Sequence, residues 1–297
     1  MPKESEQLVK SGRILAQVRE FVKKLPIQDK PLLDICEQVE GKIREFGANP
    51  AFPCNIGINE VAAHYTSPWN DTRLVPENSL VKIDFGVELG GFITDTAITL
   101  SLNPTYDSMI VAAESALQEA LSAVAPGRKL SEIGAVVERC IQRYGFRPIR
   151  NLTGHKIDRY TIHAGKSVPN VSGIESGRFE AGEVFALEPF VTLKEAEGAV
   201  RDSDGAYIFR FVRMKGAKSE EANELAEHIR ETYRTLPFAS RWIHTSWSGD
   251  AETAMQELIK NRCITGYPVL VEASGSVVSQ AEHTIIVTEG GCRVLTA

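Results

Sequence analysis

The sequence predicts an α+β protein built from two pseudo-symmetric halves around a metal site, with a helical insertion in the second half. Three observations lead to this prediction. A pair of amphipathic helices occurs twice, the two copies align at an offset of 98 residues, and each half supplies one histidine and two carboxylates from matching places. Internal repeats are considered first because a missed repeat assigns the wrong architecture to the whole chain. We expect one domain, 1–297, with half-repeats at about 1–105 and 106–297.

The length and composition limit the class of protein. Of the 297 residues, 43% are apolar and 24% are charged, as in soluble globular chains with a sizeable core. The net charge of -6 argues against a nucleic-acid partner, because a duplex binder needs a surplus of basic residues. No apolar run is long enough to span a membrane, and the five cysteines contain no CxxC pair. We therefore expect a cytoplasmic protein with no membrane partner.

The chain is predicted to begin with two helices. Leu8 and Leu15 fall on one helical face before Pro26 ends the segment. A second amphipathic stretch at about 31–46 ends at Gly47, a residue type that often follows the last helical turn.

A second helix pair repeats the first. Its segments, at about 107–124 and 130–144, are stopped by Pro126-Gly127 and by Gly145. Helix periodicity alone could align the apolar positions, but it does not explain the shared aromatic-glycine ending with proline three residues later, so the match indicates duplication. The matched pairs are Leu32/Leu130, Ile35/Ile133, Val39/Val137, Glu40/Glu138, Ile43/Ile141, Phe46/Tyr144, Gly47/Gly145 and Pro50/Pro148.

A β-hairpin is predicted in VKIDFGVELGGFITDTAITLS, with Gly90-Gly91 as its two-residue loop. This loop makes Asp84 face Ala97, and Asp95 is two residues from Ala97. Both aspartates then lie on one sheet face as diagonal neighbours, within reach of a common ion. Two carboxylates among apolar residues repel each other unless a proton or a cation lies between them. For two aspartates alone, a solvent-exposed hairpin remains the alternative.

The second half carries two further carboxylates. Glu188 in VFALEPF resembles Asp84 in its context, and Glu282 in SQAEHTIIV resembles Asp95. Four carboxylates in repeat-equivalent strand contexts suit two divalent ions such as Mn, Co, Fe or Zn. His155 follows a glycine, where the backbone can approach a site closely, and is the candidate nitrogen ligand.

Two more histidines are candidates for the same site. His163 lies eight residues after His155, consistent with the next pass of the chain along one cleft wall. His64 in the first half lies one position from the place that matches His163. For each histidine alone, an ordinary structural role is the alternative.

An insertion separates the carboxylates of the second half. Glu188 and Glu282 are 94 residues apart, whereas Asp84 and Asp95 are 11 apart, which leaves an excess of 83 residues. We expect an inserted subdomain at about 194–270. It should contain helices at about 219–236 and 250–261 before Gly266-Tyr267-Pro268 returns the chain.

Taken together, these motifs resemble the type II methionine aminopeptidases. The resemblance covers essentially the whole chain, and the long insertion is typical of the type II branch. It implies the pita-bread fold, in which two pseudo-symmetric α+β halves surround a dinuclear metal site. The matching segments are FPCNIGINEVAAHYT (52–66), KIDFGVELGGFITDTA (82–97), GH (154–155), IHAGKSVPN (162–170), LEPF (187–190) and AEHT (281–284).

The resemblance also implies a role for each site residue. All five metal-ligand positions are matched in order, by Asp84, Asp95, His155, Glu188 and Glu282. It implies that Asp95 and Glu282 bridge both ions, that Asp84 chelates one, and that His155 and Glu188 hold the other.

The remaining implied roles concern substrate and proton transfer. Glu188 would also move a proton, His163 would donate to the scissile carbonyl or the oxyanion, and His64 would contact the peptide near the scissile amide. The implied methionine pocket is lined by Phe52, Ile162 and Tyr267. Ala206 stands where relatives often carry a histidine, which is a departure from the pattern of the family.

The implied activity is removal of the initiator methionine from nascent polypeptides whose second residue is small, by a monomer acting near the ribosome. One alternative is a dipeptidase or aminopeptidase of the prolidase type, although those enzymes carry an additional N-terminal domain and only 83 residues precede Asp84 here. The other alternative is a non-catalytic binding protein on the same fold, although such relatives lose ligands that this chain keeps.

Overall fold

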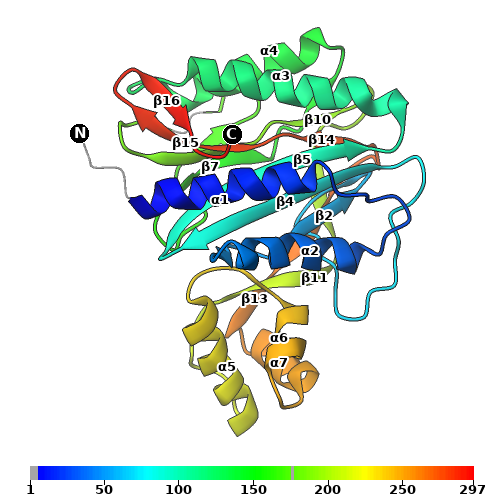
Figure 1. Ribbon diagram of the computed structural model, residues 1–297, viewed down its shortest axis with the longest axis vertical. Helices are drawn as coiled ribbons and strands as arrows, with labels where there is room; N and C mark the ends of the chain where they lie inside the picture. Colours follow the sequence, from blue (N-terminus) through cyan, green and yellow to red (C-terminus); the bar gives the residue numbers. More distant parts are fainter. Residues whose placement is uncertain (1–5, 175–176) are drawn as a thin grey trace.

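Two pairs of helices cover the strands of the two halves (Figure 1). The computed structural model describes residues 6–174 and 177–297, so the first five residues of the predicted first half-repeat lie outside it. The pairs are α1 (Glu6–Val22) with α2 (Leu32–Glu45), and α3 (Asp107–Ala123) with α4 (Leu130–Arg143). All four predicted helices are therefore confirmed. The repeat-matched apolar residues of α2 and α4, such as Ile35 and Ile133, are buried in both halves.

The first half contains the predicted hairpin. Its strands are β4 (Leu80–Leu89) and β5 (Phe92–Ser101), and Asp84 faces Ala97 as the glycine loop requires. Gly90 and Gly91 have φ values of 61° and 91°, a left-handed conformation that glycine adopts without steric cost. The edge strands β1 (Asn49–Pro50) and β2 (Asn55–Ile58) both pair with β4.

The second half contains the corresponding strands, but its central pair is interrupted. β9 (Val184–Leu187) pairs with β15 (His283–Thr288), β10 (Phe190–Thr192) pairs with β14 (Val278–Gln280), and both ladders share one register. Glu188-Pro189 and Ala281-Glu282 lie in the gap between the two ladders. The other strands of this half are β6 (Arg147–Pro148), β7 (Thr153–Ile157), β8 (Ser167–Pro169) and β16 (Gly291–Val294).

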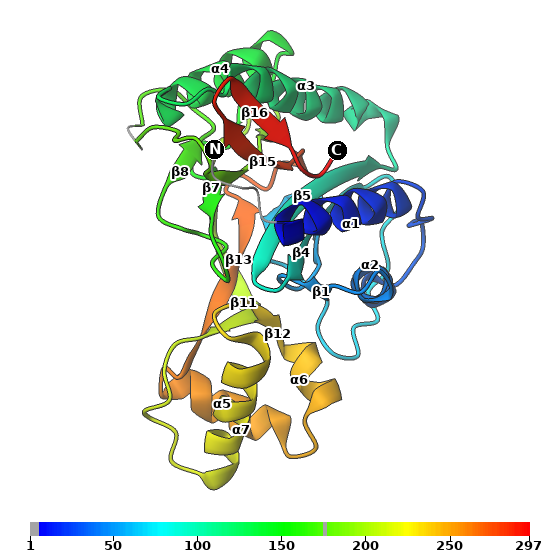
Figure 2. The same cartoon turned by 60° about the vertical axis from the view of Figure 1, so that its left-hand side comes forward.

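Between β10 and β14 the chain leaves the body of the molecule along β11 (Val200–Phe211) and returns along β13 (Ile264–Glu272) (Figure 2). These strands carry α5 (Glu220–Tyr233), β12 (Phe238–Ala239), α6 (Ser240–Ser246) and α7 (Ala251–Lys260). The two predicted helices are confirmed as α5 and α7. The seven-residue helix α6 was not predicted.

The insertion has its own apolar core, formed by residues such as Leu225, Ile229 and Leu258. It is joined to the first half because β13 also pairs with β3 (Val61–Ala63), the short strand that ends just before His64. We propose that residues 194–270 form the inserted subdomain of a single domain made from the two half-repeats.

Threonine hydroxyls connect the two halves at their centre, where β5 lies beside β14 and β15. The Thr284 hydroxyl accepts from the backbone N–H of Asp95 and donates to its carbonyl, at 2.7 and 2.8 Å. Thr96 donates to the Glu282 carbonyl at 2.7 Å. These bonds fix the backbones of Asp95 and Glu282 relative to each other. No helix within residues 6–174 and 177–297 is long and apolar enough to cross a membrane.

Candidate metal centre

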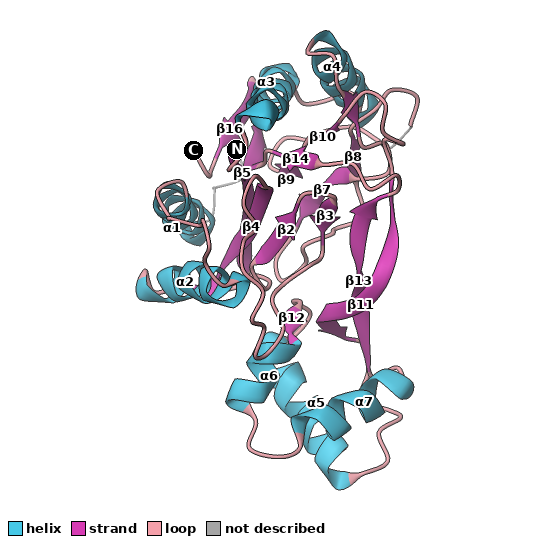
Figure 3. Cartoon of the chain, turned by 90° about the vertical axis from the view of Figure 1, so that its right-hand side faces the viewer, coloured by secondary structure: helices cyan, strands magenta, loops and turns pink. Residues whose placement is uncertain are grey.

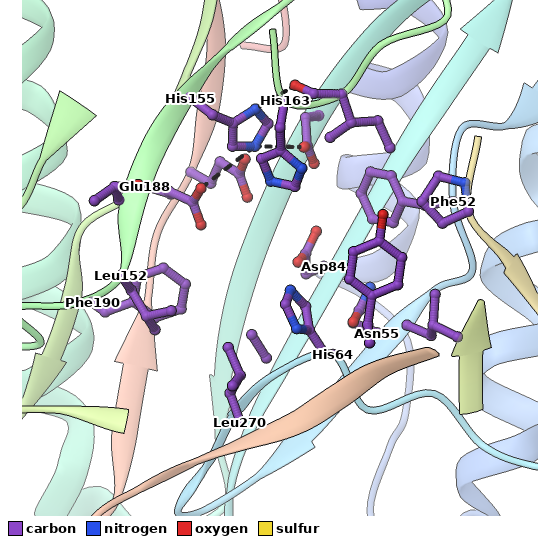
Figure 4. Close-up of a pocket in the computed structure, with 18 of the residues that line it drawn as sticks. Phe52, Asn55, His64, Asp84, Leu152, His155, His163, Glu188, Phe190 and Leu270 are labelled. Carbon is purple, nitrogen blue, oxygen red and sulfur yellow. Dashed lines mark hydrogen bonds and ion pairs between the residues drawn. The ribbon is translucent and has the colours of Figure 1, made fainter. Parts of the chain in front are cut away.

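The four predicted carboxylates converge on one cavity from both halves. Asp84 and Asp95 come from the hairpin of the first half, and Glu188 and Glu282 come from the interrupted strand pair of the second. Asp95 and Glu282 are buried, whereas Asp84 and Glu188 are partly exposed on the cavity wall. Figure 4 shows Asp84 and Glu188 pointing into this cavity from opposite sides.

Several carboxylate oxygens in this cluster are buried without a hydrogen-bond donor from any described part of the chain. They are Asp84 Oδ1, Asp95 Oδ1 and Glu282 Oε1. Burial, together with the charges of neighbouring carboxylates, raises the pKa of Asp95 and of Glu282 well above its ordinary range. Burial raises the pKa of Asp84 to about 7. A positive charge would stabilise such a cluster, because buried carboxylates repel each other and have lost the water that solvates them outside the protein.

His155 presents a nitrogen to the same cavity. Its Nδ1 donates to the carbonyl of Ile162 at 2.7 Å, so the lone pair of the neutral ring lies on Nε2. That Nε2 lies 3.6 Å from Asp95 Oδ2 and 3.5 Å from Glu188 Oε1. Burial lowers the pKa of His155 to about 3, so the ring is neutral at pH 7. A neutral ring whose lone pair faces carboxylate oxygens fits a cation held between them.

The donor set therefore fits divalent metal ions. Asp95, His155 and Glu282 each offer one ligand atom within 4.8 Å of the others. Carboxylates together with a single imidazole are the ligands that Mn, Fe, Co and Zn accept in proteins.

In the view of Figure 4, the other two candidate histidines, His163 and His64, lie on either side of Asp84. The ring of His163 lies 4.3 Å from that of His155, and burial and then the charge of Arg210 lower the pKa of His163. His64 follows β3 with a φ of 63°, and burial lowers its pKa to about 4. His64 Nδ1 is buried and has no hydrogen-bond partner among the residues that the structure describes. Both rings are therefore neutral at pH 7 and can donate one N–H.

The cavity beside the carboxylates has a volume of about 310 Å³. Phe52, Ile162 and Tyr267 line it, and Phe52 lies so close to Gly86 that a Cβ on that glycine would be 2.4 Å from the phenyl ring. Ala206 packs against the core of the insertion instead.

Other lining residues were not singled out from the sequence as pocket residues, although Ala63 and Phe190 lie within segments that match the family. The apolar ones are Ala63, Leu152, Phe190, Ile208, Pro237 and Leu270. Leu236 of the insertion packs with Phe52 and Ile162 in one apolar cluster.

Gln280 is a polar residue of the site that sequence reasoning also missed. Its side-chain amide is buried and donates to Glu188 Oε2 at 3.4 Å and to Glu282 Oε2 at 3.3 Å. It therefore orients two carboxylates at once. Its position two residues before Glu282 is the signal that could have found it, because side chains two residues apart in an extended segment point to the same side.

Comparison with known proteins agrees with this geometry. Metallopeptidase family M24 matches residues 6–289. A methionine aminopeptidase of Methanocaldococcus jannaschii is 39% identical over 98% of this chain and 98% of its own length. A methionine aminopeptidase of Methanothermobacter thermautotrophicus is 41% identical over the full length of both chains.

Solved structures show the same fold at lower sequence identity. A thermophilic Arx1 superposes with a TM-score of 0.82 at 19% identity, covering 97% of this chain and 89% of that one. A methionine aminopeptidase of Thermotoga maritima superposes with a TM-score of 0.71 at 20% identity, covering 100% of this chain and 97% of that one. The predicted pita-bread fold is thus confirmed. Together with the family match and the full-length relatives, these findings show that the chain belongs to metallopeptidase family M24, alongside its archaeal methionine aminopeptidases.

Proposed function

We propose that this chain hydrolyses the first peptide bond of nascent polypeptides and releases the N-terminal methionine when the second residue is small. The observation that carries the proposal is the cluster of five potential ligands with unpaired carboxylate oxygens, next to an apolar cavity. Relatives about 40% identical over the full chain, named methionine aminopeptidases, support the same activity.

We assign two divalent ions to the site, with Asp84, Asp95, His155, Glu188 and Glu282 as their ligands. Two such ions carry a charge of about +4, which four carboxylates balance. Asp95 and Glu282, one from each half, would hold the ions together with Asp84, His155 and Glu188. The bound ions would lower the pKa of water, so that hydroxide is available at neutral pH, and would polarise the scissile carbonyl. Co, Mn, Fe and Zn all fit these donors.

The remaining polar residues act on the peptide itself. Glu188 is partly exposed to the cavity, which supports a role in moving a proton from water to the leaving amine. His163 is neutral at pH 7 and can donate an N–H to the oxygen that gains negative charge in the transition state. His64, on the other side of the cavity, can contact the peptide near the scissile amide.

The apolar wall accounts for selection of methionine. Phe52, Ile162 and Tyr267 form an aromatic and aliphatic lining that suits an unbranched, polarizable thioether. Leu236 extends this wall from the insertion, so residues of both halves and of the insertion surround the first side chain.

We further propose that the chain acts as a monomer, since one chain supplies both halves of the site. Its partner would be the free N-terminus of a polypeptide emerging in the cytoplasm, at or near the ribosome.

The direct test is release of methionine from Met-Ala-Ser and Met-Pro peptides. We expect turnover that stops on addition of a chelator and returns when Mn, Co, Fe or Zn is added back. Cleavage restricted to dipeptides ending in proline would favour a prolidase-type activity. Purified protein that binds no divalent metal would favour a non-catalytic binding protein.

A second experiment tests the preference for a small second residue. Burial of one methionine side chain supplies only about 1.5 to 3 kcal/mol, too little to offset a clash of a bulky neighbour. Met-X-Ser peptides should therefore be cleaved efficiently when X is Gly, Ala, Ser, Thr, Val, Pro or Cys, and poorly when X is Leu, Phe, Lys or Glu. Equal kcat/KM for Met-Ala-Ser and Met-Leu-Ser would contradict this preference.

A further inference from the structure

A buried ion pair joins the insertion to the first half of the molecule. Figure 3 shows α6 as the inserted helix nearest to the strands of the body. From this helix, Arg241 contacts Glu40 of α2, and both side chains are only 2% exposed. The indole N–H of Trp242 donates to the other oxygen of Glu40 at 2.8 Å.

The same pair holds the loop that follows β3. Arg241 donates to the hydroxyl of Thr66 at 2.6 Å and to the carbonyl of Ser67 at 3.0 Å. Thr66 is two residues from His64, so the arginine fixes the loop just after that histidine.

The pair also holds a second loop, which carries Phe52. The backbone N–H of Cys54 donates to Glu40 at 3.0 Å, and its carbonyl accepts from the Thr66 hydroxyl at 2.6 Å. Both polar backbone groups of Cys54, two residues from Phe52, are thus hydrogen-bonded to Glu40 or to Thr66.

His64 needs such support from its surroundings. Its φ of 63° is a left-handed conformation that costs free energy for any residue with a Cβ, and it persists only where neighbouring structure enforces it. The Nδ1 atom of the ring is buried without a partner in the described part of the chain, and the polar contact of the ring is with the backbone of Pro268 in β13. The ring of Tyr267 lies 5.4 Å away in an edge-to-face arrangement.

We propose that Arg241 is a positioning residue, through which the insertion sets the orientation of His64 and of Phe52 in the substrate pocket. The importance of that orientation for turnover rests on the function proposed above. The insertion then has two roles at the pocket. It forms one wall, and through Arg241 it also fixes the loops that carry His64 and Phe52.

The test compares Arg241→Met and Arg241→Lys with the wild-type protein. Because the chain has six histidines, the ring resonances can be assigned in the metal-free protein by single substitution. We expect Arg241→Met to shift or broaden the resonance of His64 and to leave those of His155 and His163 in place. The kcat/KM for Met-Ala-Ser should fall by about tenfold or more, because small displacements of a positioned group are costly. Binding of divalent metal should not change.

Two further readouts distinguish positioning from simple loss of stability. Instability would lower kcat in proportion to the folded fraction, with KM and the ratio of rates for Met-Ala-Ser and Leu-Ala-Ser unchanged. Positioning predicts a change in KM or in that ratio, partly restored by Arg241→Lys. A folded Arg241→Met protein with wild-type KM, ratio and His64 resonance would overturn the proposal.

Control variants keep the test decisive. Removing one partner of a buried ion pair is strongly destabilising, whereas removing both is much less so. If Arg241→Met does not fold, the Glu40→Gln/Arg241→Met double variant and Thr66→Val are measured instead. The same readouts apply to them: the His64 resonance, and KM with the ratio of rates for Met-Ala-Ser and Leu-Ala-Ser. Arg44→Gln removes an exposed partner of Glu40 at 3.8 Å and should behave as wild type. The NMR readout needs no turnover, so failure of the proposed function in the wild-type assay is seen separately.

Discussion

The two halves of the molecule build their carboxylate pairs differently. In the first half, β4 and β5 form an uninterrupted hairpin in which Asp84 faces Ala97, so Asp95 is a diagonal neighbour. In the second half, the two ladders share one register, and across the gap between them Glu188 faces Glu282. The strand ladders make Gln280 the counterpart of Asp95. The sequence-based match of Asp95 with Glu282 is therefore wrong by two positions in strand register.

The halves also differ at the strand position that carries His155 in the second half. His155 is paired with Ala186, and the repeat-equivalent pair in the first half is Gly57 with Lys82. Gly57 has no room for a side chain, because a Cβ there would lie 2.4 Å from the Val61 carbonyl oxygen.

The side chain of Lys82, on the paired strand β4, lies beside Gly57 instead. It donates to the carbonyls of Asn59 and Val278 at 2.9 and 2.8 Å, and it is almost fully buried. One half therefore supplies a nitrogen lone pair to the cavity. The other supplies a buried lysine amine, whose pKa is lowered to about 7 by burial, and this amine joins the two sheets. The repeat is preserved in the backbone, while the side chains have diverged to produce an asymmetric site.

The largest expected effect comes from removing one carboxylate in each half. Asp95→Asn and Glu282→Gln should each lose bound metal and lower kcat/KM by more than about 100-fold. Loss of a residue that only hydrogen-bonds a metal ligand already lowers metal affinity or activity by about 10 to 100-fold. Metal content by plasma mass spectrometry and Met-Ala-Ser turnover measure this. Wild-type activity with two bound ions in either variant would show that the two halves do not share the ions as assigned.

Substitution of His163 tests whether the second half supplies one nitrogen ligand or two. His163→Ala should keep its metal and lower kcat by roughly 100-fold, the scale of losing one donor to an oxyanion. The structure supports this assignment because His155, and not His163, has its ring fixed by the Ile162 carbonyl with Nε2 facing the carboxylates. Loss of metal with unchanged kcat per bound ion would instead make His163 a ligand.

Gln280, the strand counterpart of Asp95, provides a test of how the second half holds its two glutamates. Gln280→Met removes the amide that donates to Glu188 and Glu282 while keeping side-chain volume, and it should weaken metal binding by about 10 to 100-fold. Competition with a fluorescent chelator measures the affinity. Gln118→Met on the exposed face of α3 is the matched control. Equal affinity in both variants would mean that Gln280 does not orient the glutamates.

Local patterns were sufficient to predict much of this architecture. Apolar periodicity located four helices of the halves and two of the insertion, and Gly90-Gly91 fixed the register of the first hairpin. The second pair of strands could not be placed in register, since a long insertion replaces its turn and Pro189 interrupts its ladder. Helix α6 is too short to show a period, and the contact between Arg241 and Glu40 joins residues 201 positions apart.

The smallest expected effect concerns glycines in the matched helices α2 and α4. Around Gly41 of α2, a Cβ would meet nothing within 4 Å beyond its own stretch of helix in the described chain, and its counterpart in α4 is Arg139. Gly134 of α4 lies against the loop after β8, where a Cβ would be 2.3 Å from the Val171 carbonyl oxygen. Gly41 therefore only weakens its helix, whereas Gly134 permits a close approach of backbone to backbone.

Gly41→Ala should raise the free energy of unfolding by about 0.5 to 1 kcal/mol, because alanine loses less backbone entropy than glycine when a helix forms. Gly134→Ala should lower it by about 1 to 3 kcal/mol, because the backbone must move to relieve the overlap. Urea unfolding followed by circular dichroism measures both at fixed metal concentration. If Gly41→Ala destabilised the protein as much as Gly134→Ala, Gly41 would also have to pack against other parts of the protein. That result would contradict the open surroundings of Gly41.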